Sequence, residues 1–178
     1  MLHTLRTPSN LTTPRWRLLL WHEQGGRVDA CALLEVLGVD DHKRDGATCA
    51  AVARIAQRLE MAWALVLIDR RSGELALAVG PLNTFSLYHA SIGGQLEVRD
   101  SLPALNADLG RTGGSNGALN AEGLADFIAR SIVTGPFEWS PHSVTMLKGW
   151  QTVPAGECVL LDRAGAERQR VRIEAVID

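Results

Sequence analysis

Cysteine is scarce in this sequence of 178 residues, and the cysteines present lie far apart. A disulfide-stapled scaffold or a thiolate zinc site would need more of them at closer spacing, such as C-x-x-C pairs. Two lie inside apolar helical patterns, so we interpret them as buried free thiols in a reducing compartment, with a disulfide or metal site as the alternative. The three are Cys31, Cys49 and Cys158.

Neither positive nor negative charge is in large excess. The net charge is -2 at pH 7, which does not predict a surface for nucleic acid. No apolar run approaches the roughly 18 residues of a membrane helix. The run at 18–21 is too short for the core of a signal peptide. We therefore expect a cytoplasmic protein whose partner is neither a nucleic acid nor a membrane.

Apolar residues are abundant enough for a hydrophobic core. They make up 46% of the chain, and a chain of this length folds without staples. Residues 1–14 are polar and contain two prolines, so we expect a flexible arm there. Residues 15–178 show neither a repeat nor a linker, which predicts a single domain.

The most informative stretch begins at residue 63. Residues 63–68 are apolar at every position and are followed by a charged turn with Gly73, which predicts a strand and a hairpin into a second strand at 75–79. A strand that is apolar on both sides has to be covered on both faces. We therefore expect 63–68 to be the central strand of a layered fold.

Helix and strand signals occupy most of the remaining chain. Apolar residues recur at helical spacing after Asp29, Thr48 and Asn120, each of which can cap a helix. Residues 108–117 are rich in glycine and predict a surface loop. Further strands are predicted at 16–21, 85–88, 95–99, 150–153, 157–161 and 168–173.

The order of several blocks resembles the N-terminal, glutamine-hydrolysing domain of asparagine synthetases, a class II glutamine amidotransferase. The resemblance covers about 16–178 and is stronger after residue 62. It implies an α+β fold, the αββα sandwich of N-terminal nucleophile hydrolases, truncated at the N-terminus because the early strands of the family are lacking. The blocks are residues 63–71, 87–89, 119–127, 148–149 and 153–157.

The residues that carry catalysis in that family are missing here. The family uses an N-terminal cysteine whose own amine is the base, whereas residue 2 is leucine. Residues 23–26 stand in place of its oxyanion-binding Asn-Gly pair, and 45–48 in place of its substrate clamp. We expect no catalytic residue, no cofactor and no metal site, since the five histidines share no ligand spacing. The candidate remnants of a glutamine pocket are Gln24, Gly25, Asp45 and Asn83.

The resemblance therefore implies a catalytically inactive domain that acts as a binding or scaffolding subunit. Its partner would be an ATP-dependent asparagine synthetase-like ligase that forms amides in peptide or natural-product biosynthesis, as β-lactam synthetases and lasso-peptide cyclases do with degenerate N-terminal domains. Self-association is a second form of the same hypothesis. The alternatives are a stand-alone module that holds a peptide or amino acid in the vestigial pocket, and a hydrolase that uses an internal cysteine with a histidine.

Exposed aromatic residues are the predicted contact surface, because a truncated sheet leaves apolar area and strand edges uncovered. The competing interpretation is that the arm at 1–14 folds back over the edge and that the aromatics pack inside the chain. The predicted contact residues are Trp16, Trp21, Phe137, Trp139 and Trp150.

Overall fold

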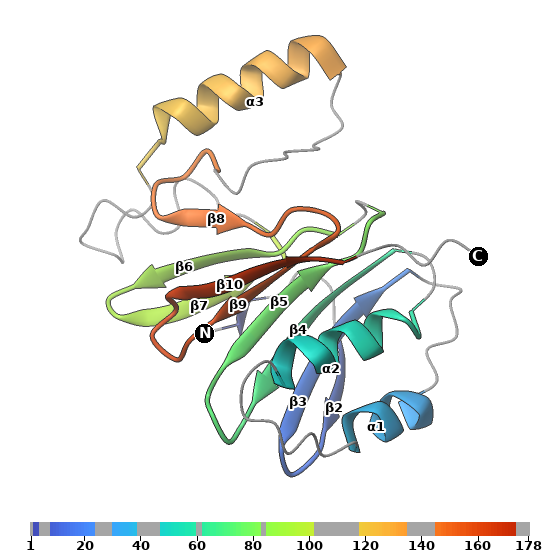
Figure 1. The fold of residues 1–178 in the computed structure, drawn as a ribbon. Helices are drawn as coiled ribbons and strands as arrows, with labels where there is room; N and C mark the ends of the chain where they lie inside the picture. Colours follow the sequence, from blue (N-terminus) through green and yellow to red (C-terminus); the bar gives the residue numbers. More distant parts are fainter. Residues whose placement is uncertain are drawn as a thin grey trace.

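The computed structural model describes residues 2–3, 8–23, 30–38, 47–59, 62–82, 85–101, 118–134 and 145–173. Within these ranges the chain forms a six-stranded sheet in the order β10-β9-β5-β4-β3-β2 and a four-stranded sheet in the order β1-β7-β6-β8 (Figure 1). Every strand pair is antiparallel except β1 with β7. The strands are β1 Leu2–His3, β2 Ser9–Thr12, β3 Trp16–His22, β4 Trp63–Asp69, β5 Leu75–Val79, β6 Tyr88–Ile92, β7 Gln95–Arg99, β8 Trp150–Thr152, β9 Glu157–Leu161 and β10 Glu167–Arg172.

The helices occupy two separate regions. α1 (Ala30–Gly38) and α2 (Ala47–Ala56) lie together on one face of the six-stranded sheet, whereas α3 (Ala121–Thr134) lies beyond β8 at the other end of the molecule (Figure 1). None of the described helices has both the length and the apolar character needed to span a membrane.

β4 is an interior strand that is buried on both faces, as its all-apolar sequence predicts. It pairs with β3 on one side and with β5 on the other, and residues 63–67 are at most 3% exposed. Alternate side chains enter two different cores, because successive residues of a strand point to opposite faces. The prediction of a doubly covered central strand at 63–68 is confirmed.

One core lies between the six-stranded sheet and the pair α1 and α2. The apolar periodicity of both helices predicts this, because Leu33, Leu37, Val52 and Ile55 all point into the sheet. Burying such side chains contributes about 1.5–3 kcal/mol each. Their partners on the sheet are Trp16, Leu18, Leu20, Trp63, Leu65, Leu67, Ala76, Ala78, Cys158 and Leu160.

The second core lies between the two sheets, which pack face to face. Leu87 and Val98 come from the four-stranded side, with Phe85 and Val153 beside them. A smaller third cluster covers the outer face of the four-stranded sheet, where Trp150 meets Ala90 and Leu147. The six-stranded sheet contributes Leu19, Trp21, Ala64, Val66, Leu75, Leu77, Val79, Val159 and Leu161 to the second core.

The predicted αββα sandwich is wrong. The described chain is mostly β-structure in two largely antiparallel sheets and contains few helical residues, which does not fit a helix layer on both outer faces. The reason lies in β7, whose inward residues Leu96 and Val98 are apolar but whose outward residues are Gln95, Glu97 and Arg99. Glu97 and Arg99 form an ion pair at 3.0 Å, so the β7 side of that face offers little apolar surface to a helix, whereas the apolar cluster around Trp150 lies over β6 and β8.

The N-terminal segment also differs from the prediction of a flexible arm at 1–14. Residues 9–12 form β2, which pairs with β3 at the edge of the six-stranded sheet. Leu11 packs against the core between the six-stranded sheet and the helices α1 and α2, here called the helix-side core, while its neighbours in the strand are exposed. A single apolar residue among polar ones gives little sequence signal, and pairing with β3 supplies the rest of the stabilisation. The competing interpretation, in which the segment folds back over the edge, describes β2 correctly.

Candidate functional site

The predicted remnants of the glutamine pocket lie outside the described residues. This holds for Gln24, Gly25, Asp45 and Asn83, so the structure does not test whether these four positions come together. They stay a prediction from the sequence.

Three of the predicted contact aromatics are core residues. Trp16 lies in the core between the helices and the six-stranded sheet, and Trp21 lies in the core between the two sheets. Trp150 lies in the third cluster, on the outer face of the four-stranded sheet. All three are at most 3% exposed. The ring of Trp16 is also covered by the Arg15 guanidinium, at 4.4 Å from the ring centroid. These tryptophans therefore stabilise the fold and are not an exposed contact surface. Phe137 and Trp139 lie outside the described residues.

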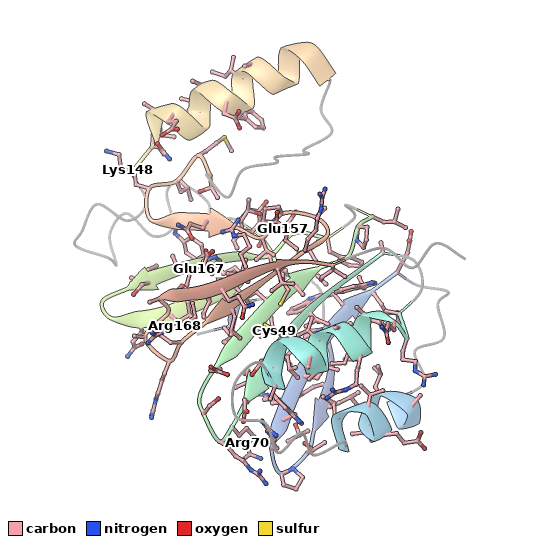
Figure 2. All side chains as sticks on the ribbon, in the orientation of Figure 1. Cys49, Arg70, Lys148, Glu157, Glu167 and Arg168 are labelled. Atoms are coloured by element: carbon pink, nitrogen blue, oxygen red, sulfur yellow. The ribbon has the colours of Figure 1, made fainter. Side chains whose placement is uncertain are left out.

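The most reactive group in the described chain lies where α2 meets β9. Cys49 is in the first turn of α2 and is half-buried, and Cys158 on β9 is buried in the helix-side core. The two thiols are hydrogen-bonded to each other. Figure 2 shows Cys49 at the junction between α2 and the six-stranded sheet. The fold thus brings together two cysteines that are distant in the sequence.

The hydrogen bond makes the two thiols chemically unequal. Donation from Cys158 lowers the pKa of Cys49 to about 7, against the opposing effects of burial and the Glu74 carboxylate. The same hydrogen bond, together with burial, raises the pKa of Cys158. A thiolate therefore forms on Cys49 near neutral pH while Cys158 keeps its proton. Because the thiolate is the reactive form, Cys49 is the nucleophile of the pair.

Polar groups surround Cys49. Its sulfur lies 3.8 Å from Oε1 of Gln169 on β10, and the neighbouring Thr48 hydroxyl donates to the Glu74 carboxylate at 2.9 Å. Among the described residues, the titratable groups that act on Cys49 are Cys158 and Glu74, with no histidine. The hydrolase alternative requires a histidine base beside the thiol, and this part of the structure does not supply one.

A second unusual group is the imidazole of His89 on β6. It is 4% exposed, and its Nε2 atom is buried without a hydrogen-bond partner. Burial lowers the pKa of His89 to about 4, while Glu167 raises it and Arg170 lowers it. The ring is therefore neutral at pH 7.

Next to His89, an ion network follows the edge strand β10. The Arg170 guanidinium lies 2.9 Å from Glu167 and 3.3 Å from Glu157 on β9. The hydrogen bond with Arg170 lowers the pKa of Glu167, and the reciprocal interaction raises the pKa of Arg170. Both carboxylates thus have a partner, which is the arrangement of a structural network rather than of a general acid.

The acidic, histidine and cysteine side chains do not gather into a metal site in the described ranges, where no three of them form a suitable group. Comparison with known proteins yields no relative, because neither a family model nor a curated protein matches this chain. The resemblance to amidotransferase domains accordingly rests on the quoted blocks of sequence.

Neither thiol partner was recognisable in the sequence. The pattern around Cys49 predicts helix α2, and the pattern around Cys158 predicts strand β9, but neither pattern says that the helix crosses that strand at that residue. His89 follows an apolar segment with no signal that separates a buried histidine from an exposed one. Only the packing of the sheets and helices defines these environments.

Proposed function

We propose that the chain is a catalytically inactive, amidotransferase-like binding domain that acts through protein contact. Its partner is an ATP-dependent, asparagine synthetase-like enzyme that forms amide bonds in peptide or natural-product biosynthesis. The family resemblance supports the identity of the partner. The sequence contains no P-loop, which supports placing the ATP chemistry outside these 178 residues.

The observation that carries the proposal is the exposed apolar surface around α3. Five large apolar side chains are exposed in the described chain, and three of them lie within ten residues at this helix. Leu119 is 48% exposed, Phe127 38% and Ile128 49%. Apolar groups gathered in one region mark a contact site more often than the same groups scattered singly.

The first turn of α3 is held firmly, which presents this surface in a defined orientation. The backbone N–H of Asn120 donates to the Met146 carbonyl at 2.8 Å, and the side-chain amide of Asn120 donates to the Thr145 carbonyl at 3.1 Å. Gly123 packs so closely on the Thr145 carbonyl that no side chain fits there. A helix that is fixed at its beginning and apolar on its exposed side suits recognition by a groove on a partner.

Sedimentation velocity at micromolar concentration tests the proposal. The purified chain is run alone and with the product of the neighbouring gene, which on our proposal is the synthetase-like enzyme, and we expect a faster complex in the mixture. Leu119→Asp and Ile128→Asp should each weaken the complex by about tenfold or more, because each places a charge in an apolar contact.

Ala129→Asp is the matched control, because Ala129 is exposed on the same helix and lies about 100° around its axis from Ile128. It should leave the complex intact. A chain that sediments as a monomer with and without the synthetase would overturn the proposal, as would a control variant that weakens binding as much as Ile128→Asp does.

A further inference from the structure

Two thiols meet between a helix and a strand that are otherwise packed by apolar side chains. Ala51, Val52 and Ile55 hold α2 on the six-stranded sheet, and Cys158 belongs to the same core. Cys49 packs against that core from its edge and keeps part of its surface open to solvent. The pair therefore has one accessible member and one buried member in contact with each other.

From this arrangement we infer that Cys49 and Cys158 form an oxidation-sensitive dithiol that a hydroperoxide converts into an intramolecular disulfide. Cys49 is the residue that reacts first with the peroxide, because it is accessible and polar groups lie beside it. Cys158 is the resolving residue, because its thiol already contacts the Cys49 sulfur and is shielded from other reagents.

The chemistry balances in two steps. The Cys49 thiolate attacks one oxygen of hydrogen peroxide, the O–O bond breaks, and a sulfenic acid and hydroxide form, the latter taking a proton to become water. The Cys158 sulfur then attacks the sulfenic sulfur, its own proton leaves with the departing hydroxide, and a disulfide and a second water form. The peroxide is reduced by two electrons and the dithiol is oxidised by two. An external thiol reductant reverses the change.

The surroundings favour this reaction over that of an ordinary buried thiol. The lowered pKa of Cys49 gives it a substantial thiolate fraction at neutral pH, and its location in the first turn of α2 adds the positive end of the helix dipole. Glu74 opposes this effect, and its carboxylate accepts a hydrogen bond from the Thr48 hydroxyl at 2.9 Å. The inference does not depend on the partner proposed above, since all its groups lie within one chain.

Peptide mapping after oxidation tests the inference directly. The full chain is treated with equimolar hydrogen peroxide at pH 7, digested without reductant and analysed by mass spectrometry. We expect a cross-linked pair of peptides containing Cys49 and Cys158 that separates with dithiothreitol. Cys31→Ser is the control. It leaves both Cys49 and Cys158 unchanged and should give the same cross-link.

Two single variants assign the roles. Cys158→Ser should leave a sulfenic acid on Cys49 that dimedone traps, and Cys49→Ser should slow peroxide consumption by about tenfold. In the unsubstituted chain, which avoids any effect of substitution on folding, the rate of Cys49 alkylation by iodoacetamide should have its midpoint at about pH 7.

Three results would overturn the inference. The first is oxidation of the unsubstituted chain without a Cys49–Cys158 cross-link. The second is peroxide consumption by the Cys49→Ser variant at the rate of the unsubstituted chain. The third is an alkylation midpoint at about 8.5, the value of an ordinary free cysteine.

Discussion

The guanidinium group of Arg15 donates two hydrogen bonds to one carboxylate oxygen of Asp69, from Nε at 3.2 Å and from Nη2 at 3.0 Å. Asp69 ends β4 and is buried, while Arg15 belongs to the turn between β2 and β3. The other carboxylate oxygen accepts the Arg71 amide at 2.8 Å. The Asp69 carboxylate thus joins the turn of the β2–β3 hairpin to the turn of the β4–β5 hairpin.

Removing the arginine should destabilise the fold. Arg15→Ala leaves a buried carboxylate with one hydrogen bond and uncovers Trp16, so we expect the free energy of unfolding to fall by about 2 kcal/mol. Urea denaturation followed by tryptophan fluorescence measures it. Arg17→Ala, at an exposed position of β3, is the control and should change stability by less than about 0.5 kcal/mol. If Arg15→Ala and Asp69→Asn are additive in the double variant, the two groups are not coupled.

Gly123 should not tolerate alanine, although alanine favours helices by about 1 kcal/mol. A Cβ atom at this position would collide with the Thr145 carbonyl, so α3 would have to shift from its support. We expect Gly123→Ala to lower the free energy of unfolding by at least about 1 kcal/mol. Ala129→Gly is the reference for helix propensity alone. A Gly123→Ala protein that is more stable than the parent would contradict this packing.

Stability should fall in mild acid because of His89. Its pKa is about 4 in the folded chain and about 6.5 when unfolded, so below pH 6.5 the unfolded state binds the extra proton. The loss grows as the pH falls through the window from 6.5 to 4 and reaches about 3 kcal/mol. The His89→Gln variant should lose less stability between pH 6.5 and 5 than the parent does. An NMR titration that places the His89 midpoint near 6.5 would refute this account.

The purified chain should release no ammonia from glutamine. The described thiols have no histidine base beside them, and the sequence lacks the terminal cysteine and oxyanion donors of the resembled family, each of which contributes orders of magnitude in rate. A coupled ammonia assay at millimolar glutamine measures it. Turnover that survives replacement of all three cysteines would require another nucleophile.

The sequence predicted those parts of the fold in which one pattern determines the outcome. Residues 63–68 are apolar throughout, and no packing other than burial on both faces satisfies them. The spacing of Val52 and Ile55 likewise predicted a helix with one buried face. In these places local sequence and tertiary packing favour the same structure.

The remaining features depend on contacts that no local pattern contains. The resemblance implied a second helical layer, but the outward residues Glu97 and Arg99 of β7 form an ion pair at 3.0 Å, which makes that part of the sheet face polar. Trp16, Trp21 and Trp150 were predicted to be exposed because a missing edge was assumed, but β2 covers the edge beside β3, and Trp150 is buried against Ala90 and Leu147. The thiol pair depends on where α2 crosses β9, which is a property of the whole packing.

The ion network on β10 bears on how this protein behaves at high concentration. Among the described strands, β10 is the outer one of its sheet, and an open strand edge invites another copy to add a strand of its own. Three arginines alternate along it, Arg168, Arg170 and Arg172, and all are exposed. A second copy approaching in register would bring like charges together before any backbone hydrogen bond formed. The edge thereby resists the strand addition that leads to aggregation and fibre growth.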